Sequence, residues 1–204
     1  MSKKTFKNLF KFCFICSAAF ISLNASNSIA NANEVTASSI KDIKNMLGDA
    51  RSEASEDEPY IISVKAGNYK LDSTIEIPSY TTLSFDEDAN INCKSTGEYA
   101  IRIRNAENAV VEGGIFNGSG ILVNGSDNVS IKDTVIENPP YGGIVVKGVN
   151  KQCSLIGNTV NNSKKWSITL LGAEFEGNIE EKTNNPQEEA WNNLIIIDQF
   201  DLNK

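Results

Sequence analysis

The sequence contains no histidine. This absence excludes every mechanism that needs an imidazole, including Ser-His-Asp triads, Cys-His dyads and HExxH zinc sites. Basic residues are also few, because 19 lysines and arginines stand against 26 aspartates and glutamates, for a formal net charge of −7. Hydrophobic residues still make up 40% of the 204 residues, which is enough for the core of one domain. Composition therefore indicates a folded, acidic protein without imidazole chemistry.

Residues 1–32 have the pattern of a secretory signal peptide. An apolar stretch from Phe12 to Leu23 follows a basic start and precedes small residues that end at Ala32. The basic residues are Lys3, Lys4, Lys7 and Lys11. The stretch is shorter than the roughly 20 residues of a spanning helix. We therefore expect cleavage near Ala32 rather than an uncleaved anchor, with a secreted or cell-surface protein that keeps no stable membrane anchor.

Cleavage of the leader would make the net charge more negative. All four charges of the leader are lysines, so 15 basic and 26 acidic residues would remain, for a net charge of −11. No basic stripe is left to neutralise phosphates, and nucleic acid is therefore not expected as a partner. An anionic polysaccharide would also be repelled overall, unless a local basic patch or a bound cation intervenes.

The remaining chain divides into three predicted parts. Residues 33–58 hold an amphipathic helix over 38–53, which Ser38 or Ser39 can cap with Asp42 in its first turn. Residues 59–173 consist of short alternating strands broken by Gly, Asn, Asp and Pro. Residues 174–204 lose this period, and we expect an acidic loop followed by a terminal strand.

Three apolar columns recur through the strands with a period near 23 residues. The first column contains Ile75/Ile77, Ile101/Ile103, Ile121/Val123, Ile144/Val146 and Ile168/Leu170. The second contains Leu83, Val111, Ile131 and Leu155, and the third contains Ile91, Phe116, Ile136 and Val160. Turn-forming residues stand at the corners: Gly113, Gly118, Asn138, Gly142, Gly148 and Asn162. Three strands per repeat leave no room for a helix, so the columns predict an all-β parallel β-helix of about five coils.

Two segments resemble a known superfamily. Residues 61–92 (IISVKAGNYKLDSTIEIPSYTTLSFDEDANIN) and 108–146 (NAVVEGGIFNGSGILVNGSDNVSIKDTVIENPPYGGIVV) are similar to coils of the right-handed parallel β-helix proteins of the pectate-lyase and polygalacturonase superfamily. The resemblance covers about residues 38–172 and implies a right-handed helix with an N-terminal capping helix. That superfamily holds lyases, hydrolases, epimerases, esterases, adhesins and non-catalytic proteins, so the resemblance predicts architecture rather than chemistry.

Catalysis has limited support in the sequence. Pro140-Tyr141-Gly142-Gly143 stands where the polygalacturonases carry Asn-Thr-Asp-Gly, and a Gly-His-Gly is absent, so the two carboxylates of glycoside hydrolysis are not expected. The alternative is a small or truncated polysaccharide lyase or epimerase acting on uronate polymers, with Ca²⁺ as its cofactor. Its outward basic residues would be Arg102, Arg104, Lys132 and Lys147. We favour the simpler interpretation that these residues form a solvated face with cross-strand ion pairs, such as Lys132 with Glu112.

Metal binding is not expected either. Asp86 and Asp88 begin a D-x-D-x-N run, but Ile91 replaces the glycine of a calcium loop. We therefore expect a solvated acidic turn, with these two residues as weak metal candidates and no cofactor.

Aromatic residues point to a ligand. Tyr99 and Trp166 stand two residues before the first column, in line with Ser119 and Gly142, and Tyr141 is adjacent. Exposed aromatics along one edge can stack on sugar rings, or else they pack over the corners of the coils. We favour an exported, non-catalytic module that uses Tyr99, Tyr141 and Trp166 to bind a polysaccharide or cell-surface glycan.

The two cysteines outside the leader are expected to remain thiols. Cys93 and Cys153 fall two to three coils apart, which puts their Cα atoms beyond the roughly 7 Å limit for a disulfide. The end of the chain leaves three alternatives. Residues 174–204 fold over the last coil, the open coil is an oligomer interface, or the chain is a truncated copy of a longer β-helix.

Overall fold

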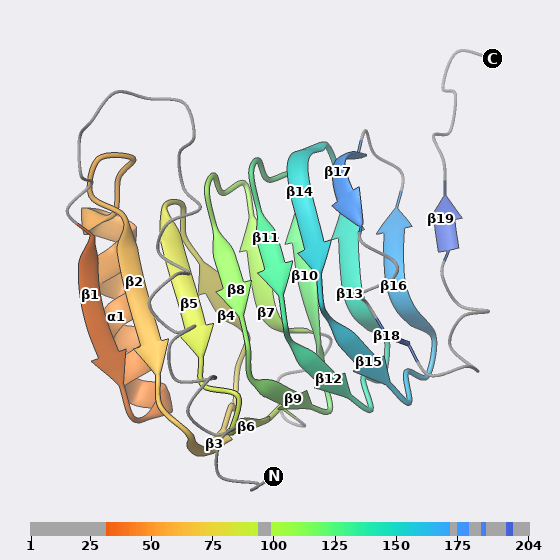
Figure 1. Ribbon diagram of the computed structural model, residues 1–204, viewed down its shortest axis with the longest axis horizontal. Helices are drawn as coiled ribbons and strands as arrows, with labels where there is room; N and C mark the ends of the chain where they lie inside the picture. Colours follow the sequence, from red (N-terminus) through yellow and green to blue (C-terminus); the bar gives the residue numbers. More distant parts are fainter. Residues whose placement is uncertain (1–31, 94–98, 172–174, 180–184, 187–194, 198–204) are drawn as a thin grey trace, which may run out of the picture. The chain divides into compact units, whose positions relative to one another are not determined.

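The computed structural model describes residues 32–93, 99–171, 175–179, 185–186 and 195–197. The predicted signal peptide lies outside these residues, apart from Ala32. No helix in the described part of the chain combines the length and the apolar character needed to cross a membrane. The strands stack side by side from β1 to β19 in three parallel sheets (Figure 1).

Each coil contributes one strand to each sheet. Sheet A contains β1 (Asn33–Ala37), β2 (Tyr60–Val64), β5 (Thr81–Phe85), β8 (Val110–Glu112), β11 (Ser130–Lys132), β14 (Asn150–Ile156) and β17 (Phe175–Ile179). Sheet B contains β3 (Gly67–Lys70), β6 (Ala89–Asn92), β9 (Ile115–Asn117), β12 (Val135–Glu137), β15 (Thr159–Asn161) and β18 (Asn185–Pro186). Sheet C contains β4 (Ile75–Ile77), β7 (Tyr99–Arg104), β10 (Gly120–Asn124), β13 (Gly142–Lys147), β16 (Trp166–Leu171) and β19 (Ile195–Ile197).

The strand registers confirm the parallel β-helix. Leu83, Val111, Ile131 and Leu155 pair in turn along sheet A, so the second predicted column is one continuous ladder. The third column pairs in the same way along sheet B, and the first along sheet C. Like side chains therefore stack coil on coil and are buried from water, which supplies the main stabilisation.

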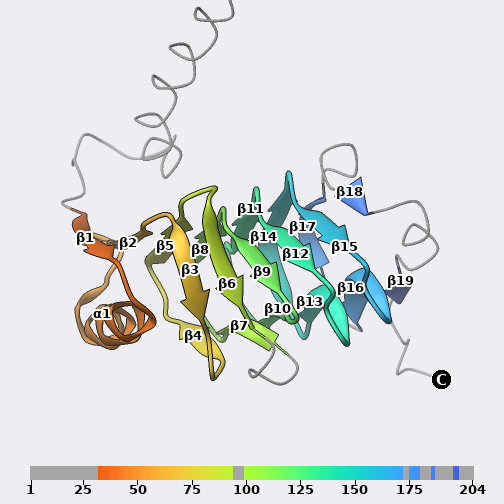
Figure 2. The ribbon, with the colours of Figure 1, turned by 90° about the horizontal axis from the view of Figure 1, so that it is seen from below.

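The single described helix, α1 (Ile40–Glu53), packs against β1, β2 and β4 at one end of the stack (Figure 2). Ser39 is its N-cap, and its hydroxyl accepts a hydrogen bond from the Asp42 N–H at 3.1 Å. Ile43 and Leu47 are buried in the core that the sheets enclose. The predicted capping helix is thus confirmed, whereas β1, which pairs with β2 ahead of the helix, was not predicted.

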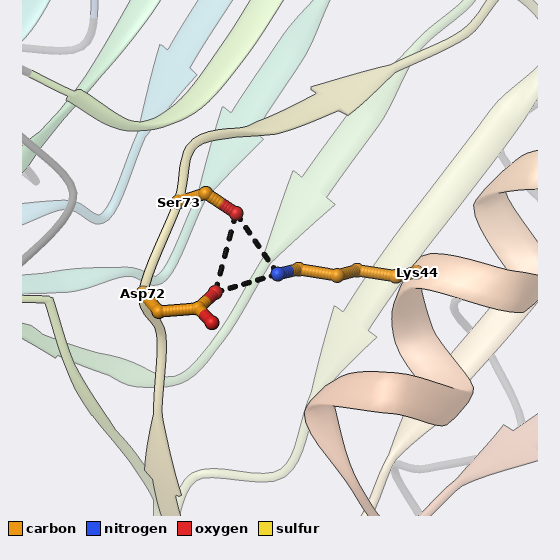
Figure 3. A network of polar contacts seen from close by, with 3 residues as sticks. All are labelled: Lys44, Asp72 and Ser73. Atoms are coloured by element: carbon orange, nitrogen blue, oxygen red, sulfur yellow. Dashed lines mark hydrogen bonds and ion pairs between the residues drawn. The ribbon is translucent and has the colours of Figure 1, made fainter.

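Polar contacts also tie α1 to the first coil. Lys44 Nζ lies 2.6 Å from Asp72 Oδ1 and 2.9 Å from Ser73 Oγ in the turn between β3 and β4 (Figure 3). Both charged side chains are exposed, so the pair contributes little to stability. The buried side chains of Ile43 and Leu47 supply most of the attachment of the helix to the coil.

Most of the turn residues between the strands have the backbone conformation that the sequence predicted. Asn138, Asn162, Gly113, Gly118 and Gly148 all have φ between 52° and 94°, the left-handed region that asparagine and glycine tolerate. Gly142 differs, because it is the first residue of β13 and has no positive φ. A Cβ at residue 142 would lie 2.6 Å from Val145 Cγ2, so this glycine provides space rather than a turn.

The C-terminal part contains more strands than the sequence predicted. Residues 174–192 were expected to form a loop, but β17 pairs with β14 and β18 pairs with β15. β19 coincides with the predicted terminal strand and pairs with β16. The stack therefore has a sixth coil beyond the five of β2–β16. Two apolar columns continue into it, since Ile179 pairs with Leu155 and Ile196 pairs with Leu170, whereas the third column ends at Pro186 opposite Val160.

Cys93 and Cys153 are both buried thiols that form no disulfide, as predicted. Burial raises the pKa of each thiol to about 12. A thiol with so high a pKa carries almost no thiolate near neutral pH, so the two side chains act as small apolar groups of the core.

Candidate functional site

Two aromatic side chains and one lysine meet where sheet B turns into sheet C. Lys165 Nζ lies 5.1 Å from the centroid of the Tyr141 ring and 5.8 Å from that of the Trp166 ring. Tyr141 stands before β13, and Trp166 begins β16 on the next coil. We call Tyr141, Lys165 and Trp166 the aromatic corner. Both distances are within the range of cation–π attraction, so the ammonium holds the two rings around one point of the surface.

The backbone fixes this corner. The Trp166 N–H donates to the Tyr141 carbonyl at 3.3 Å, and the Lys164 N–H donates to the Pro139 carbonyl at 3.1 Å. Gly142 pairs with Trp166, and a Cβ at residue 142 would lie 4.0 Å from Trp166 Cε3. Val145 Cγ2 fills the place of the absent side chain, so the backbone of β13 packs closely beside the strand that carries the indole ring.

The corner is accessible and lies on the outside of the coils. Tyr141 is 38% exposed, and with Val149 it is one of two large apolar side chains exposed in the described part of the chain. Trp166 is half-buried. Exposed rings that keep a fixed geometry present a flat apolar face, and the Tyr141 hydroxyl and the Lys165 ammonium add polar groups beside it.

Tyr99, the third aromatic candidate, does not join this corner. It begins β7, so the coil that carries β10 lies between it and Tyr141. The predicted alignment with Ser119 is wrong by one residue, because Tyr99 pairs with Gly120 at an irregularity in the register. A bulge of this kind adds a residue to one strand without changing the apolar column, so the sequence pattern does not reveal it.

The basic candidates lie on two different sheets. Arg102 Nη1 is 2.9 Å from Glu76 Oε1 on sheet C, with Arg104 Nη2 4.0 Å from the same oxygen. Lys132 Nζ is 2.6 Å from Glu112 Oε2 on sheet A. The pair of Lys132 with Glu112 is the cross-strand ion pair that the simpler interpretation expected, whereas the pairing of Glu76 with the two arginines was not predicted.

Lys147 is the remaining basic candidate. It shares a column with Asn124 and Arg104 on the outer face of sheet C, as predicted. Its ammonium has no hydrogen bond or ion pair within the described part of the chain. Three of the four basic candidates are therefore on sheet C and one is on sheet A, and the strands do not gather them around one point.

Asp86 and Asp88 occupy the turn between β5 and β6. Asp86 Oδ1 accepts a hydrogen bond from the Asp88 N–H at 2.9 Å, and the Asp86 carbonyl accepts one from the Ala89 N–H. These bonds stabilise a tight turn through the side chain that begins it. Across the described ranges, three or more His, Cys, Asp or Glu residues do not come together in a way that could hold a metal ion.

Lys165 is the member of the aromatic corner that the sequence pattern did not single out. Its signal is the run Lys164-Lys165-Trp166, which places two cations beside a ring at the turn into β16. Comparisons of the chain with protein-family models, curated proteins and solved structures found no match. Function is therefore inferred from these side chains and their surroundings.

Proposed function

We propose that this chain is an exported, non-catalytic β-helix module that binds a carbohydrate at the aromatic corner. The observation that carries the proposal is the position of Lys165 Nζ over both the Tyr141 and the Trp166 rings. Sugar rings have an apolar C–H face that stacks on an aromatic face, and hydroxyl groups that pair with polar neighbours. Two rings on successive coils would contact one or two sugar units.

The ion pairs formed by the basic residues support glycan binding rather than glycan cleavage. Arg102 and Lys132 are already paired with Glu76 and Glu112, on separate sheets. A lyase needs a free base and a charge-neutralising group beside the same sugar. The expected leader supports export. The resemblance to the pectate-lyase and polygalacturonase superfamily is part of this proposal, and it supports a glycan as the partner.

A glycan array with the full chain tests the proposal. Wild-type protein should retain at least one class of glycan, and Tyr141→Ala and Trp166→Ala should each weaken that binding about tenfold, because centrally placed aromatics carry a large share of binding energy. Lys70→Ala is the control, since it removes an exposed lysine from β3, outside the corner. An array without binding, or aromatic variants that bind as well as wild type, would overturn the proposal.

The same preparation tests catalysis. Incubation with uronate polysaccharides, with and without Ca²⁺, should produce no rise in the ultraviolet absorbance of unsaturated products. A rise that depends on calcium would replace the binding function with the lyase alternative.

A further inference from the structure

A pocket lies at the other end of the sheet C strands. The aromatic corner precedes β13 and β16, whereas this pocket of about 260 Å³ is formed by turns that follow β7, β10 and β13. Its polar and apolar walls include Asn105, Glu107, Ser126, Asp127, Val149 and Lys151. We call it the turn pocket. Since the strands are parallel, the aromatic corner lies at the amino ends of the sheet C strands and the turn pocket lies at their carboxyl ends.

Three charged residues stand one above another in the turn pocket. Glu107 pairs with Asp127, and Asp127 pairs with Lys151, through isolated parallel bridges on successive coils. Coils that pair in this way are about 4.8 Å apart. None of the three takes part in an ion pair with another described residue. The column therefore presents two carboxylates and one ammonium to solvent, with one negative charge in excess.

Neighbouring groups position the first carboxylate. The Tyr80 hydroxyl donates a hydrogen bond to Glu107 Oε2 at 2.9 Å, and the Glu107 N–H donates to Ser79 Oγ at 3.1 Å. These bonds leave the second carboxylate oxygen of Glu107 for a ligand. In the turn, the Asp127 N–H donates to the Ala106 carbonyl, and the Asp127 carbonyl accepts from the Asn108 N–H. The Asp127 carboxylate accepts no hydrogen bond from another described residue.

The floor of the turn pocket is held by a buried polar network. Asn150 Oδ1 accepts from the Ser126 N–H at 2.9 Å, and Asn150 Nδ2 donates to the Lys147 and Gly148 carbonyls. Ser126 Oγ accepts from the Ala106 N–H at 3.2 Å. Ser126 and Asn150 are both buried, so these bonds fix the turns before any ligand arrives.

The walls combine charge with an apolar surface. Val149 is 56% exposed and supplies the apolar part of the lining. The volume suits one hexose-sized ring rather than a drug-sized ligand. The two carboxylates attract a cation, and the Lys151 ammonium above them can donate to a hydroxyl oxygen. In the described part of the chain no three His, Cys, Asp or Glu side chains come together around this point, so the set suits a hydroxylated organic ammonium better than a metal ion.

We propose that the turn pocket binds the ammonium-bearing ring of an amino sugar, a specificity that rests on the proposed glycan-binding function. The ligand ammonium lies between Glu107 and Asp127, its hydroxyls pair with Lys151 and Asn105, and its C–H face lies against Val149. The net charge of −11 expected after leader cleavage also attracts a cationic glycan and repels an anionic one.

Calorimetry with the full chain and matched oligosaccharides tests this specificity. The probes are glucosamine oligomers, N-acetylglucosamine oligomers of the same length and galacturonic acid oligomers. Glucosamine oligomers should bind about tenfold more tightly than the acetylated ones, because acetylation removes the charge that the carboxylates recognise. Asp127→Asn and Glu107→Gln should each remove most of this preference, while Asp88→Asn, which removes a carboxylate from another turn, should leave it unchanged.

The outcomes separate the two proposals. Equal binding of both amino-sugar oligomers, lost in Tyr141→Ala, would overturn the turn pocket and leave the proposed function in place. Binding of glucosamine oligomers that depends on Asp127 but not on Tyr141 or Trp166 would support the pocket and overturn the aromatic corner. If Asp88→Asn loses the preference equally, the effect is one of overall charge and the turn pocket is overturned. If none of the three probes binds, the turn pocket is overturned, and the glycan array decides the aromatic corner separately.

Discussion

Replacing Gly120 with alanine should separate two coils that the fold holds in contact. A Cβ at residue 120 would lie 2.0 Å from the Gly142 carbonyl oxygen and 2.4 Å from that of Gly143. Both oxygens belong to β13, which pairs with β10 in register. Gly120 has no positive φ, so the whole effect of this substitution comes from the lack of space.

The expected cost follows from what has to move. Extra methylenes in a packed core usually cost about 1–3 kcal/mol, because neighbouring side chains adjust. Here the obstructing atoms are backbone oxygens of the next coil, so we expect a loss of about 3 kcal/mol or more in the free energy of unfolding. In urea, with a slope of about 1–3 kcal/mol per molar, the unfolding midpoint should fall by roughly 1–3 M, measured by far-ultraviolet circular dichroism.

Gly48 offers the matched control. It is exposed within α1, and a Cβ there would meet no atom within 4 Å. Gly48→Ala should therefore raise the free energy of unfolding by about 0.5–1 kcal/mol, since alanine favours the helix. The same chemical change should thus have opposite signs at the two sites. A Gly120→Ala protein that unfolds at the wild-type midpoint would refute the stacking of β10 against β13.

Four further predictions concern stability and reactivity. Ser39→Ala should lower the free energy of unfolding by about 1 kcal/mol through loss of the helix cap, measured in urea. The Ser39 hydroxyl lowers the pKa of Asp42, so the ionised carboxylate stabilises the fold at neutral pH. This contribution is lost as the pH falls below about 4. Asp42→Asn should therefore make the melting temperature less sensitive to acid in that range. Burial raises the pKa of Cys93 and Cys153 to about 12, so iodoacetamide at about pH 8 should label both in urea and neither in native protein, as read by peptide mass mapping. Phe116→Ala should cost about 3–5 kcal/mol, because the ring is fully buried, and an unchanged urea midpoint would contradict its place in the core.

The repeating interior was predictable because each coil must bury the same three positions. Leu83, Val111, Ile131 and Leu155 recur at steps of 28, 20 and 24 residues, so the turns vary in length while the stacked position stays the same. The helix was predictable from its cap and its apolar face, since Ser39 and Asp42 stand just before and within the first turn.

Features that depend on backbone geometry were not predictable. β1 and β17 each extend the second apolar column by one residue, Val35 or Ile179, and a single aligned residue does not distinguish a strand from a loop. The bulge that aligns Tyr99 with Gly120 leaves Ile101 and Ile121 in register, so the apolar pattern is the same with or without it.

The candidate sites were predictable to different degrees. Tyr141 and Trp166 stood out as aromatics at one edge, but the position of Lys165 over both rings required the structure. The turn pocket did have a signal in the sequence. Glu107 and Asp127 occupy equivalent places in successive repeats, and extending the columns into the turns would have aligned them.

The most direct test of glycan binding at the aromatic corner is the fluorescence of Trp166 itself. Trp166 and Trp191 are the two tryptophans of the chain, so Trp191→Phe leaves Trp166 as the only indole reporter. Titration of this variant with a glycan retained on the array should change its emission in a saturable way, with the affinity found by calorimetry. An emission that stays constant while calorimetry shows the glycan bound would place the binding site elsewhere on the protein.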